Sequence, residues 1–308
     1  GLAPNERGKR ERQEALAAQT GFDLEAGRVF AARLFVSENA VRALLVAHHA
    51  VVDAVSWATI AEELLGEPRV DSRADAMSAA THGAAYAKWV EALAAQADSS
   101  ALRAEADEWL RMADGVEAER DQDGGSVASE QTLIASLEPD LTTALLTEIH
   151  DAYGTRPREI LIAALSRALS RASGRARHLI DVESHGREAE AAGAPSLDVS
   201  STVGWLTTVW PLALTEESVP EEANRSVSIK TVKESIRTVP GNGLGFGLLA
   251  YMATDPELRR KMASIPERGL LFNYLGRVDG GDVQASPVAA IGDELAGPAR
   301  SALGTRPY

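Results

Sequence analysis

The stretch HHAVVDAVSW, residues 48–57, decides how the first part of this chain folds. It follows the apolar run VRALLVA (Val41–Ala47), whose length and composition predict a short buried strand. Beyond it, apolar residues recur at helical spacing until Gly66, namely Trp57, Ile60, Ala61 and Leu64. The pattern therefore predicts a strand, a polar turn that carries two adjacent histidines, and a helix.

His48 and His49 bring two imidazoles to the end of the predicted strand. An imidazole changes protonation state near neutral pH, as a general base must, and a buried one needs partners for its ring nitrogens. A zinc site is disfavoured, because adjacent strand residues point to opposite faces, the chain has no cysteine, and no His-x-x-x-His pair lies on a predicted helix. A structural role is favoured for His48. For His49, a structural role and a general-base role both stay open on these residues.

Length and composition restrict the class of protein. With 308 residues the chain can form one large or two medium domains, and its 45% apolar and 25% charged residues are typical of a globular protein. A formal net charge of −14 argues against a nucleic acid or an anionic membrane as the main partner. The lack of cysteine excludes a disulfide framework and a thiolate nucleophile, and is compatible with a cytoplasmic location. No apolar run reaches membrane-spanning length, and residues 1–20 lack a signal-peptide core.

Residues 115–130 (GVEAERDQDGGSVASE) are the predicted boundary between an N-terminal subdomain, 1–120, and a C-terminal subdomain, 121–308. The segment is acidic, contains a Gly-Gly pair and has no apolar periodicity. Before it we expect a strand at 28–35 and helices at 76–97 and 101–113, whose aromatic residues are interpreted as core. After it we expect strands at 133–137, 178–183 and 201–214, and helices at 139–149 and 157–173. The alternation predicts sheets covered by helices, an α/β (α+β) fold.

Glu183 ends the predicted strand at 178–183. A carboxylate at a strand end near apolar neighbours can have its pKa raised by loss of solvent, which suits proton transfer near neutral pH. The plain alternative is an exposed or arginine-paired glutamate, as most of the 45 acidic residues here are expected to be.

Five segments, in order along the chain, resemble one family. They are HHAVVDAVSW (48–57), DVESHGRE (181–188), TVGWLT (202–207) followed by Pro211, VKE (232–234) with GLGFG (243–247), and FNYLG (272–276). The first resembles the His-His-x-x-x-Asp-x-x-Ser-Trp signature of the condensation/epimerization superfamily of nonribosomal peptide synthetases. Residues 181–188, 202–207 and 272–276 resemble motifs of its epimerization branch, and the segment from 232 to 247 also fits the family.

The resemblance implies a chloramphenicol-acetyltransferase-like fold, with two subdomains in a V and the site in the tunnel between them. It implies that His49 and Glu183 act as the two acid/base groups that remove and return the α-proton of an L-aminoacyl or peptidyl thioester. Asn273 and Tyr274 match positions near the site, where donors would face the developing oxyanion. His48 and Asp53 are implied as supporting residues, Asp53 through an ion pair with an unidentified arginine. His185 and Arg187 are interpreted as structural or electrostatic supports.

The resemblance also implies the partners. We expect the substrate to be carried on the phosphopantetheine arm of a peptidyl carrier domain, beside neighbouring synthetase domains in the cytoplasm, and we expect this chain to bind no metal or other cofactor. The family pattern extends beyond both ends of the chain. Three positions depart from it: Ala54 and Ser184 stand where glycine is usual, and Ser201 where arginine is common. A condensation domain that forms a peptide bond, and a non-catalytic carrier-docking domain, are the alternatives.

Overall fold

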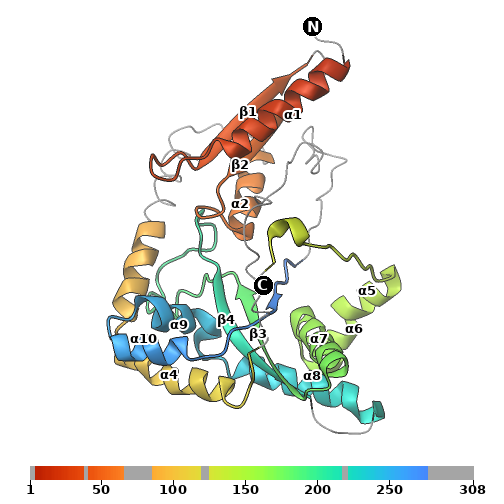
Figure 1. Cartoon of the computed structure of the whole chain (residues 1–308), viewed down its shortest axis with the longest axis vertical. Helices are drawn as coiled ribbons and strands as arrows, with labels where there is room; N and C mark the ends of the chain where they lie inside the picture. The colour runs from red at the N-terminus through yellow and green to blue at the C-terminus, as the bar shows by residue number, and fades with distance from the viewer. Residues whose placement is uncertain (1–3, 38–40, 66–84, 119–124, 217–220, 277–308) are drawn as a thin grey trace. The chain divides into compact units, whose positions relative to one another are not determined.

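The computed structural model describes residues 4–37, 41–65, 85–118, 125–216 and 221–276 (Figure 1). Contacts group the described residues into two compact units. The first contains the described residues up to Tyr86 together with Ser200–Leu206, and the second contains Ala87–Val199 and Thr207–Tyr274. These units differ from the predicted division at residue 120, because helix α4 (Ser100–Ala113) precedes that residue but packs on strand β4 (Thr208–Thr215).

The first unit is built on a hairpin. Strands β1 (Phe30–Val36) and β2 (Val41–Ala47) pair antiparallel, from Phe30 opposite Ala47 to Val36 opposite Val41, and helix α1 (Pro4–Thr20) packs on both. Helix α2 (Ala54–Leu65) follows. The bounds of the predicted strand 41–47 are confirmed, but its predicted burial is wrong, because every residue of β2 is exposed or half-buried. A two-stranded hairpin offers two faces, and the alternating exposure along β1 shows that only one of them is partly covered.

The second unit holds most of the helices. Its strands β3 (Arg177–Ser184), β4 and β5 (Leu271–Phe272) form a sheet of order β4-β3-β5, in which β3 pairs antiparallel with β4 and parallel with β5. Its other elements are a helical segment that ends at residue 96, α4, η1 (Val127–Ser129), α5 (Pro139–Leu146), α6 (Glu148–Tyr153), α7 (Pro157–Ser173), α8 (Glu221–Arg237), η2 (Pro240–Gly243), α9 (Leu244–Gly247), the π-helical turn η3 (Leu248–Met252) and α10 (Pro256–Ala263).

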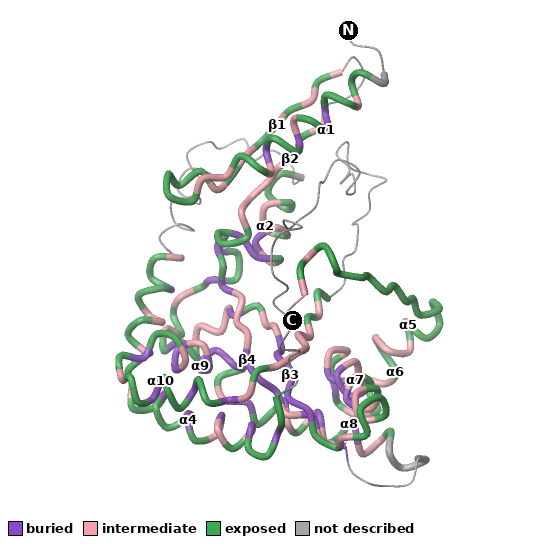
Figure 2. The backbone as a smooth tube through the Cα atoms, in the orientation of Figure 1, coloured by how far each residue is buried: buried purple, intermediate pink, exposed green. Residues whose placement is uncertain are grey.

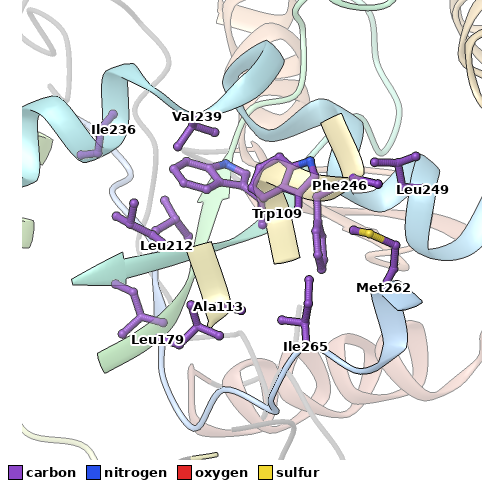
Figure 3. Packing of buried hydrophobic residues seen from close by; sticks show 14 of the residues in the cluster. Trp109, Ala113, Leu179, Leu212, Ile236, Val239, Phe246, Leu249, Met262 and Ile265 are labelled. Atoms are coloured by element: carbon purple, nitrogen blue, oxygen red, sulfur yellow. The ribbon is translucent and has the colours of Figure 1, made fainter. Parts of the chain in front are cut away.

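The core of the second unit gathers around β3 and β4, where buried positions concentrate (Figure 2). Helix α7 packs on β3, and α4, α8 and α9 pack on β4. Trp109 of α4 is fully buried and meets Phe246 edge to face, with ring centroids 5.4 Å apart (Figure 3). Leu179 to Val182 are all buried, since β3 lies between two strands and both of its faces are covered. Trp89 and Trp109 are buried, which confirms their interpretation as core residues, whereas Tyr86 is only half-buried.

Several helix limits follow local sequence signals. Pro139 and Pro157 are each the first residue of a helix, as predicted, because a helix needs no N–H there. Gly174 ends α7 in the left-handed conformation, also as predicted. The predicted continuous helix at 139–149 is wrong in one respect: Thr147, with φ −128° and ψ −77°, separates α5 from α6.

Two strand predictions need correction. Residues 133–137 form no strand, and the side chains of Leu133 and Ile134 are 96% and 88% exposed. An apolar run becomes a strand only when a neighbouring strand pairs with its backbone, and this run has no such neighbour in the described part of the chain. The predicted strand at 201–214 begins only at Thr208. Residues 200–206 belong to the first unit, where their backbone bonds to side chains of the histidine motif.

Candidate functional site

The histidine motif forms the connection between β2 and α2. The backbone N–H of His48 donates to the carbonyl of Val29 (2.8 Å), and the N–H of Val51 donates to the carbonyl of His48 (3.0 Å). β2 ends at Ala47, so the loop leaves the hairpin at the histidines. His48 is half-buried and His49 is exposed. The predicted order of strand, polar turn and helix is confirmed here.

His49 is anchored through one ring nitrogen. Its Nδ1 lies 2.7 Å from the carbonyl oxygen of Val52. A carbonyl oxygen only accepts, so Nδ1 carries a proton and donates it. In the neutral imidazole this leaves Nε2 as the unprotonated acceptor. The loop therefore presents Nε2 of His49 as the basic nitrogen.

His48 has the opposite tautomer. The backbone N–H of Ala50 donates to Nδ1 of His48 (3.1 Å), so in the neutral ring the proton lies on Nε2. The ring meets Phe22 edge to face, with centroids 5.8 Å apart. The two adjacent imidazoles thus differ in chemistry, because His49 presents an acceptor at Nε2 and His48 presents a donor.

Asp53 and Ser56 form a buried polar pair at the start of α2. Asp53 is 1% exposed, and its Oδ1 accepts from the backbone N–H of Ser56 (2.8 Å), as the cap of a helix N-terminus does. Oδ2 of Asp53 accepts from the N–H of Leu206 (3.1 Å). The Ser56 hydroxyl accepts from the N–H of Gly204 (3.0 Å) and lies within donating distance of Asp53 Oδ1 (2.7 Å) and the Gly204 carbonyl (2.9 Å). The predicted arginine partner of Asp53 stays a prediction.

These bonds attach residues 203–206 to the histidine motif. Thr202, Gly204 and Leu206 are buried, while Val203 and Trp205 are each 40% exposed. A Cβ at Gly204 would lie 2.5 Å from the Tyr86 ring, so the close approach of this ring requires glycine. The Trp205 ring lies on His49, with centroids 4.5 Å apart and planes inclined by 45°.

Ala54, where the family usually has glycine, is not strained. It is the first residue of α2, and among the described residues the single non-glycine with positive φ is Asn242. The strain that a left-handed conformation would cause in an alanine therefore does not arise at this position.

Glu183 lies near the end of β3, half-buried and opposite Val209 of β4. Beside it, the Ser184 hydroxyl accepts from Nε1 of Trp210 (3.1 Å) and from Nη1 of Arg158 (3.4 Å). Burial lowers the pKa of the Arg158 guanidinium, although the neighbouring Glu159 carboxylate opposes this shift. Ser184, the second departure from the family pattern, is thus hydrogen-bonded at the end of the strand.

The residues after β3 form a tight turn. Gly186 has φ +65°, a conformation that favours glycine. Nδ1 of His185 accepts from the backbone N–H of Arg187 (3.0 Å), and its Nε2 lies 3.6 Å from the Glu188 carboxylate. The supporting roles of His185 and Arg187 stay a prediction.

Strand β5 brings Asn273 and Tyr274 to the same end of the sheet as Glu183. The parallel register pairs Asp181 with Leu271 and Val182 with Phe272, and Asn273 and Tyr274 come next in the chain. Nε of Arg268 donates to Oδ1 of the buried Asp181 (2.8 Å). This ion pair connects the segment that precedes β5 to strand β3.

The predicted site residues therefore fall into two groups. His48, His49 and Asp53 lie together in the first unit, and Glu183, Asn273 and Tyr274 lie at one end of the sheet in the second. Within the described ranges, no three His, Cys, Asp or Glu side chains are grouped in a way that could hold a metal ion. In the same ranges no helix has the length and apolar character needed to cross a membrane.

Sequence reasoning missed the contacts of four residues. They are Ser56, Trp205, Arg158 and Arg268. Ser56 and Trp205 stand inside recognised motifs, but their partners are about 150 positions away in the sequence, and nothing in either motif indicates which residue the other contacts. Arg158 and Arg268 lie outside the motifs and carry no sequence signal of their own.

Residues 4–282 match the family model of the Condensation domain. The chain belongs to this family. As a condensation-family domain, it is 34% identical over 280 residues to Bacitracin synthase 3 of Bacillus licheniformis, and 31% identical over 274 residues to Surfactin synthase subunit 1 of Bacillus subtilis (strain 168). The alignments cover 89% and 87% of this chain, which spans only 4% and 7% of the length of these two relatives.

Solved structures agree with the family. The epimerization domain from the third module of tyrocidine synthetase B aligns with a TM-score of 0.75 and 25% identity, covering 97% of this chain and 66% of that one. The first condensation domain of the calcium-dependent antibiotic synthetase, solved with a substrate analogue, aligns with a TM-score of 0.51 and 18% identity, over 83% of this chain and 54% of that one. The condensation-family domain described here thus has the predicted chloramphenicol-acetyltransferase-like fold.

Proposed function

We propose that this domain epimerizes the α-carbon of an L-aminoacyl or peptidyl thioester carried on the phosphopantetheine arm of a peptidyl carrier domain. The observation that carries the proposal is the tautomer of His49, whose Nδ1–H is held by the Val52 carbonyl and whose Nε2 is therefore available as a base. The domain would act in the cytoplasm beside neighbouring synthetase domains. Domains of this family act on carrier-bound substrates and have no cofactor of their own.

The proposed reaction moves one proton off the α-carbon and one proton back. Nε2 of His49 takes the α-proton, and the electron pair of the C–H bond passes to the thioester carbonyl, forming an enolate. The Glu183 carboxylic acid then protonates the opposite face of the α-carbon. In the reverse direction the two groups exchange roles, so the pair needs one protonated and one unprotonated member. Asn273 or Tyr274 would donate to the enolate oxygen.

Two observations favour epimerization over condensation. A carboxylate in the position of Glu183 is needed for two-sided proton transfer, whereas amide formation from two carrier-bound substrates does not require it. The epimerization domain of tyrocidine synthetase B also aligns with a higher TM-score than the condensation domain of the calcium-dependent antibiotic synthetase, 0.75 against 0.51. Condensation stays the second candidate, because the histidine motif is common to both branches.

Solvent exchange tests the proposal. An L-aminoacyl or peptidyl thioester on a phosphopantetheine-loaded carrier is incubated with the full chain in deuterated water, and the α-deuterium content and D/L ratio are measured after hydrolysis. The parent protein should introduce deuterium and move the substrate toward a D/L mixture. His49→Ala and Glu183→Gln should each slow this exchange by about 10²–10⁴-fold, the usual contribution of a positioned acid or base.

Matched controls use the same residue types outside the proposed pair. His150→Ala removes an exposed imidazole on α6, and Glu148→Gln neutralises an exposed carboxylate on the same helix, so both variants should exchange at the parent rate. A folded parent that forms an amide from two loaded carriers without α-exchange would support condensation and end the epimerase proposal. A folded parent with neither activity would favour a carrier-docking role.

A further inference from the structure

The imidazole ring of His49 needs a second contact if its Nε2 is to stay in one orientation. The bond from Nδ1 to the Val52 carbonyl fixes one point of the ring but leaves the ring free to rotate about that bond. The side chain is exposed, so packing in the core does not hold it. A contact on the ring plane would remove the remaining freedom.

Trp205 supplies such a contact. Its ring centroid lies 4.5 Å from that of His49, within the range of favourable aromatic pairs. The indole contacts the imidazole with the two ring planes inclined by 45°, while the Val52 carbonyl accepts from Nδ1. Together the two contacts limit both the position and the rotation of Nε2.

Trp205 itself is held from both sides. The preceding residue, Gly204, donates its N–H to Ser56, and the following residue, Leu206, donates its N–H to Asp53. Both acceptors are buried, at 0% and 1% exposure, so water competes little for these bonds. The residue between two fixed backbone N–H groups has little freedom to move, and its indole is kept on His49.

We propose that Trp205 is a positioning residue for His49, and that Asp53 and Ser56 act through it by holding the backbone on either side. The inference rests on the proposed function only for its effect on rate, because the ring contact exists without substrate. The two motifs, about 150 positions apart, would then serve one purpose. Asp53 and Ser56 of the histidine motif hold the backbone around Trp205, and Trp205 in turn holds the His49 ring.

Nuclear magnetic resonance of histidine-labelled protein tests the contact directly. In the parent, the ring protons of His49 should show the upfield shift that a neighbouring indole causes, and the ring ¹⁵N shifts should report a proton on Nδ1. Trp205→Leu should abolish the upfield shift, and Trp205→Phe should keep much of it. Ser56→Ala should reduce it, since one of the two backbone anchors is lost. Val203→Ala, at a position of equal exposure in the same segment, should leave it unchanged.

The exchange assay then tests the consequence. Trp205→Leu should lower kcat for α-exchange by about 10–100-fold with little change in KM, because a misdirected base loses geometry rather than substrate affinity. Trp205→Phe should recover most of the rate. The inference would be overturned if the His49 chemical shifts were unchanged in Trp205→Leu. It would also be overturned if the parent catalysed α-exchange and Trp205→Leu had the same kcat. A parent without exchange whose His49 shift still depends on Trp205 would refute the proposed function and leave the positioning contact established.

Discussion

The histidine loop and the strand that carries Glu183 are held in place by different forces. Around His49 the main fixed points are polar: two buried side chains, Asp53 and Ser56, bind the backbone of residues 204–206. Around Glu183 they are mainly apolar, because β3 is the central strand of its sheet and Leu179, Ile180 and Val182 before the glutamate are buried. Directional hydrogen bonds hold the exposed loop at a few backbone positions, whereas apolar burial stabilises the whole length of the strand.

Because the two regions are held differently, substitutions in them should have different consequences. Core burial is shared among many side chains, so removing one large member leaves a cavity that weakens the whole unit. The hydrogen bonds of Asp53 and Ser56 involve only a few atoms, so removing one side-chain oxygen should destabilise only the segment that it binds. Substitutions in the two regions should therefore differ in size and in what they disturb.

The largest expected effect is in the core of the second unit. Trp109→Ala should lower the free energy of unfolding by about 3–5 kcal/mol, because Trp109 is fully buried and packs on Phe246. Denaturant unfolding followed by circular dichroism measures the change. Tyr251→Ala, at a side chain 77% exposed, is the control and should stay within about 0.5 kcal/mol of the parent. A loss below about 1 kcal/mol for Trp109→Ala would contradict the apolar account of this unit.

A smaller, local effect is expected at the polar anchor of the first unit. Ser56→Ala should cost about 1–3 kcal/mol, since it leaves the buried N–H of Gly204 without its acceptor. Hydrogen exchange should show faster exchange at Gly204 and Leu206, with β3 amides unchanged. Ser129→Ala removes an exposed hydroxyl and serves as the control. If β3 amides also lost protection in Ser56→Ala, the histidine loop and strand β3 would not be stabilised independently, and the account given above would be wrong.

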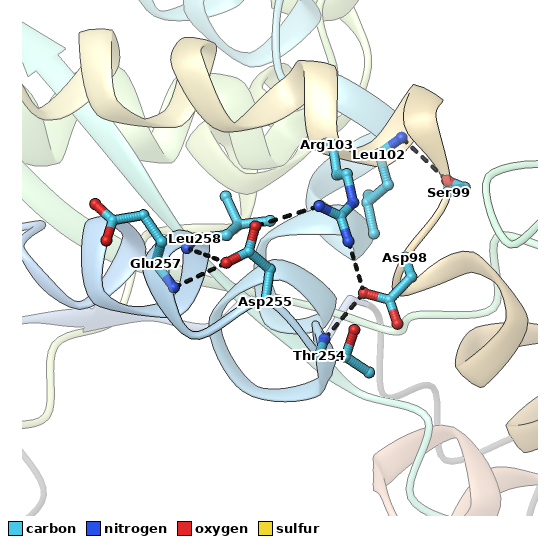
Figure 4. Close-up of polar contacts among 8 residues, drawn as sticks. All are labelled: Asp98, Ser99, Leu102, Arg103, Thr254, Asp255, Glu257 and Leu258. Atoms are coloured by element: carbon cyan, nitrogen blue, oxygen red, sulfur yellow. Dashed lines mark hydrogen bonds and ion pairs between the residues drawn. The ribbon is translucent and has the colours of Figure 1, made fainter.

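Acid stability should depend on Asp98 and Asp255 in the second unit. Hydrogen bonds from the Thr254 backbone lower the pKa of Asp98, those from Glu257 and Leu258 lower the pKa of Asp255, and Arg103 bridges both carboxylates (Figure 4). A carboxyl with a lowered folded pKa stabilises the fold above its unfolded pKa of about 3.9 and loses that contribution as pH falls. The Asp98→Asn, Asp255→Asn double variant should thus lose less stability than the parent between pH 5 and pH 3 in denaturant titrations. Equal losses would contradict this assignment.

Glu105 should show a weaker effect of the opposite sign. Burial raises the pKa of its carboxyl, so the folded state binds this proton more readily than the unfolded state does. The stabilisation from the protonated form is present below the unfolded pKa and is lost as pH rises through the folded pKa. Glu105→Gln should therefore be at least as stable as the parent at pH 7 and lose the advantage near pH 4. Lower stability of this variant at pH 7 would indicate that the charged carboxylate has a favourable partner.

Local structure was predictable where local chemistry decides it. Strand Val41–Ala47, helix starts at Pro139 and Pro157, and the end of α7 at Gly174 follow from composition, proline and glycine. The predicted strand at 133–137 failed because an apolar run does not reveal whether another strand pairs with it. The predicted burial of β2 failed for the same kind of reason, since burial depends on what covers a face.

The family, the fold class and the candidate acid/base residues could be predicted without a structure, because the motifs place particular residue types in a fixed order. Three features needed the folded chain: which nitrogen of His49 is basic, what Asp53 and Ser56 hold, and why residues 201–206 lie outside the strand predicted for them. The physical reason is that a hydrogen bond or a ring contact needs its two partners at a set distance and direction. Partners about 150 positions apart meet that condition only when the chain has folded.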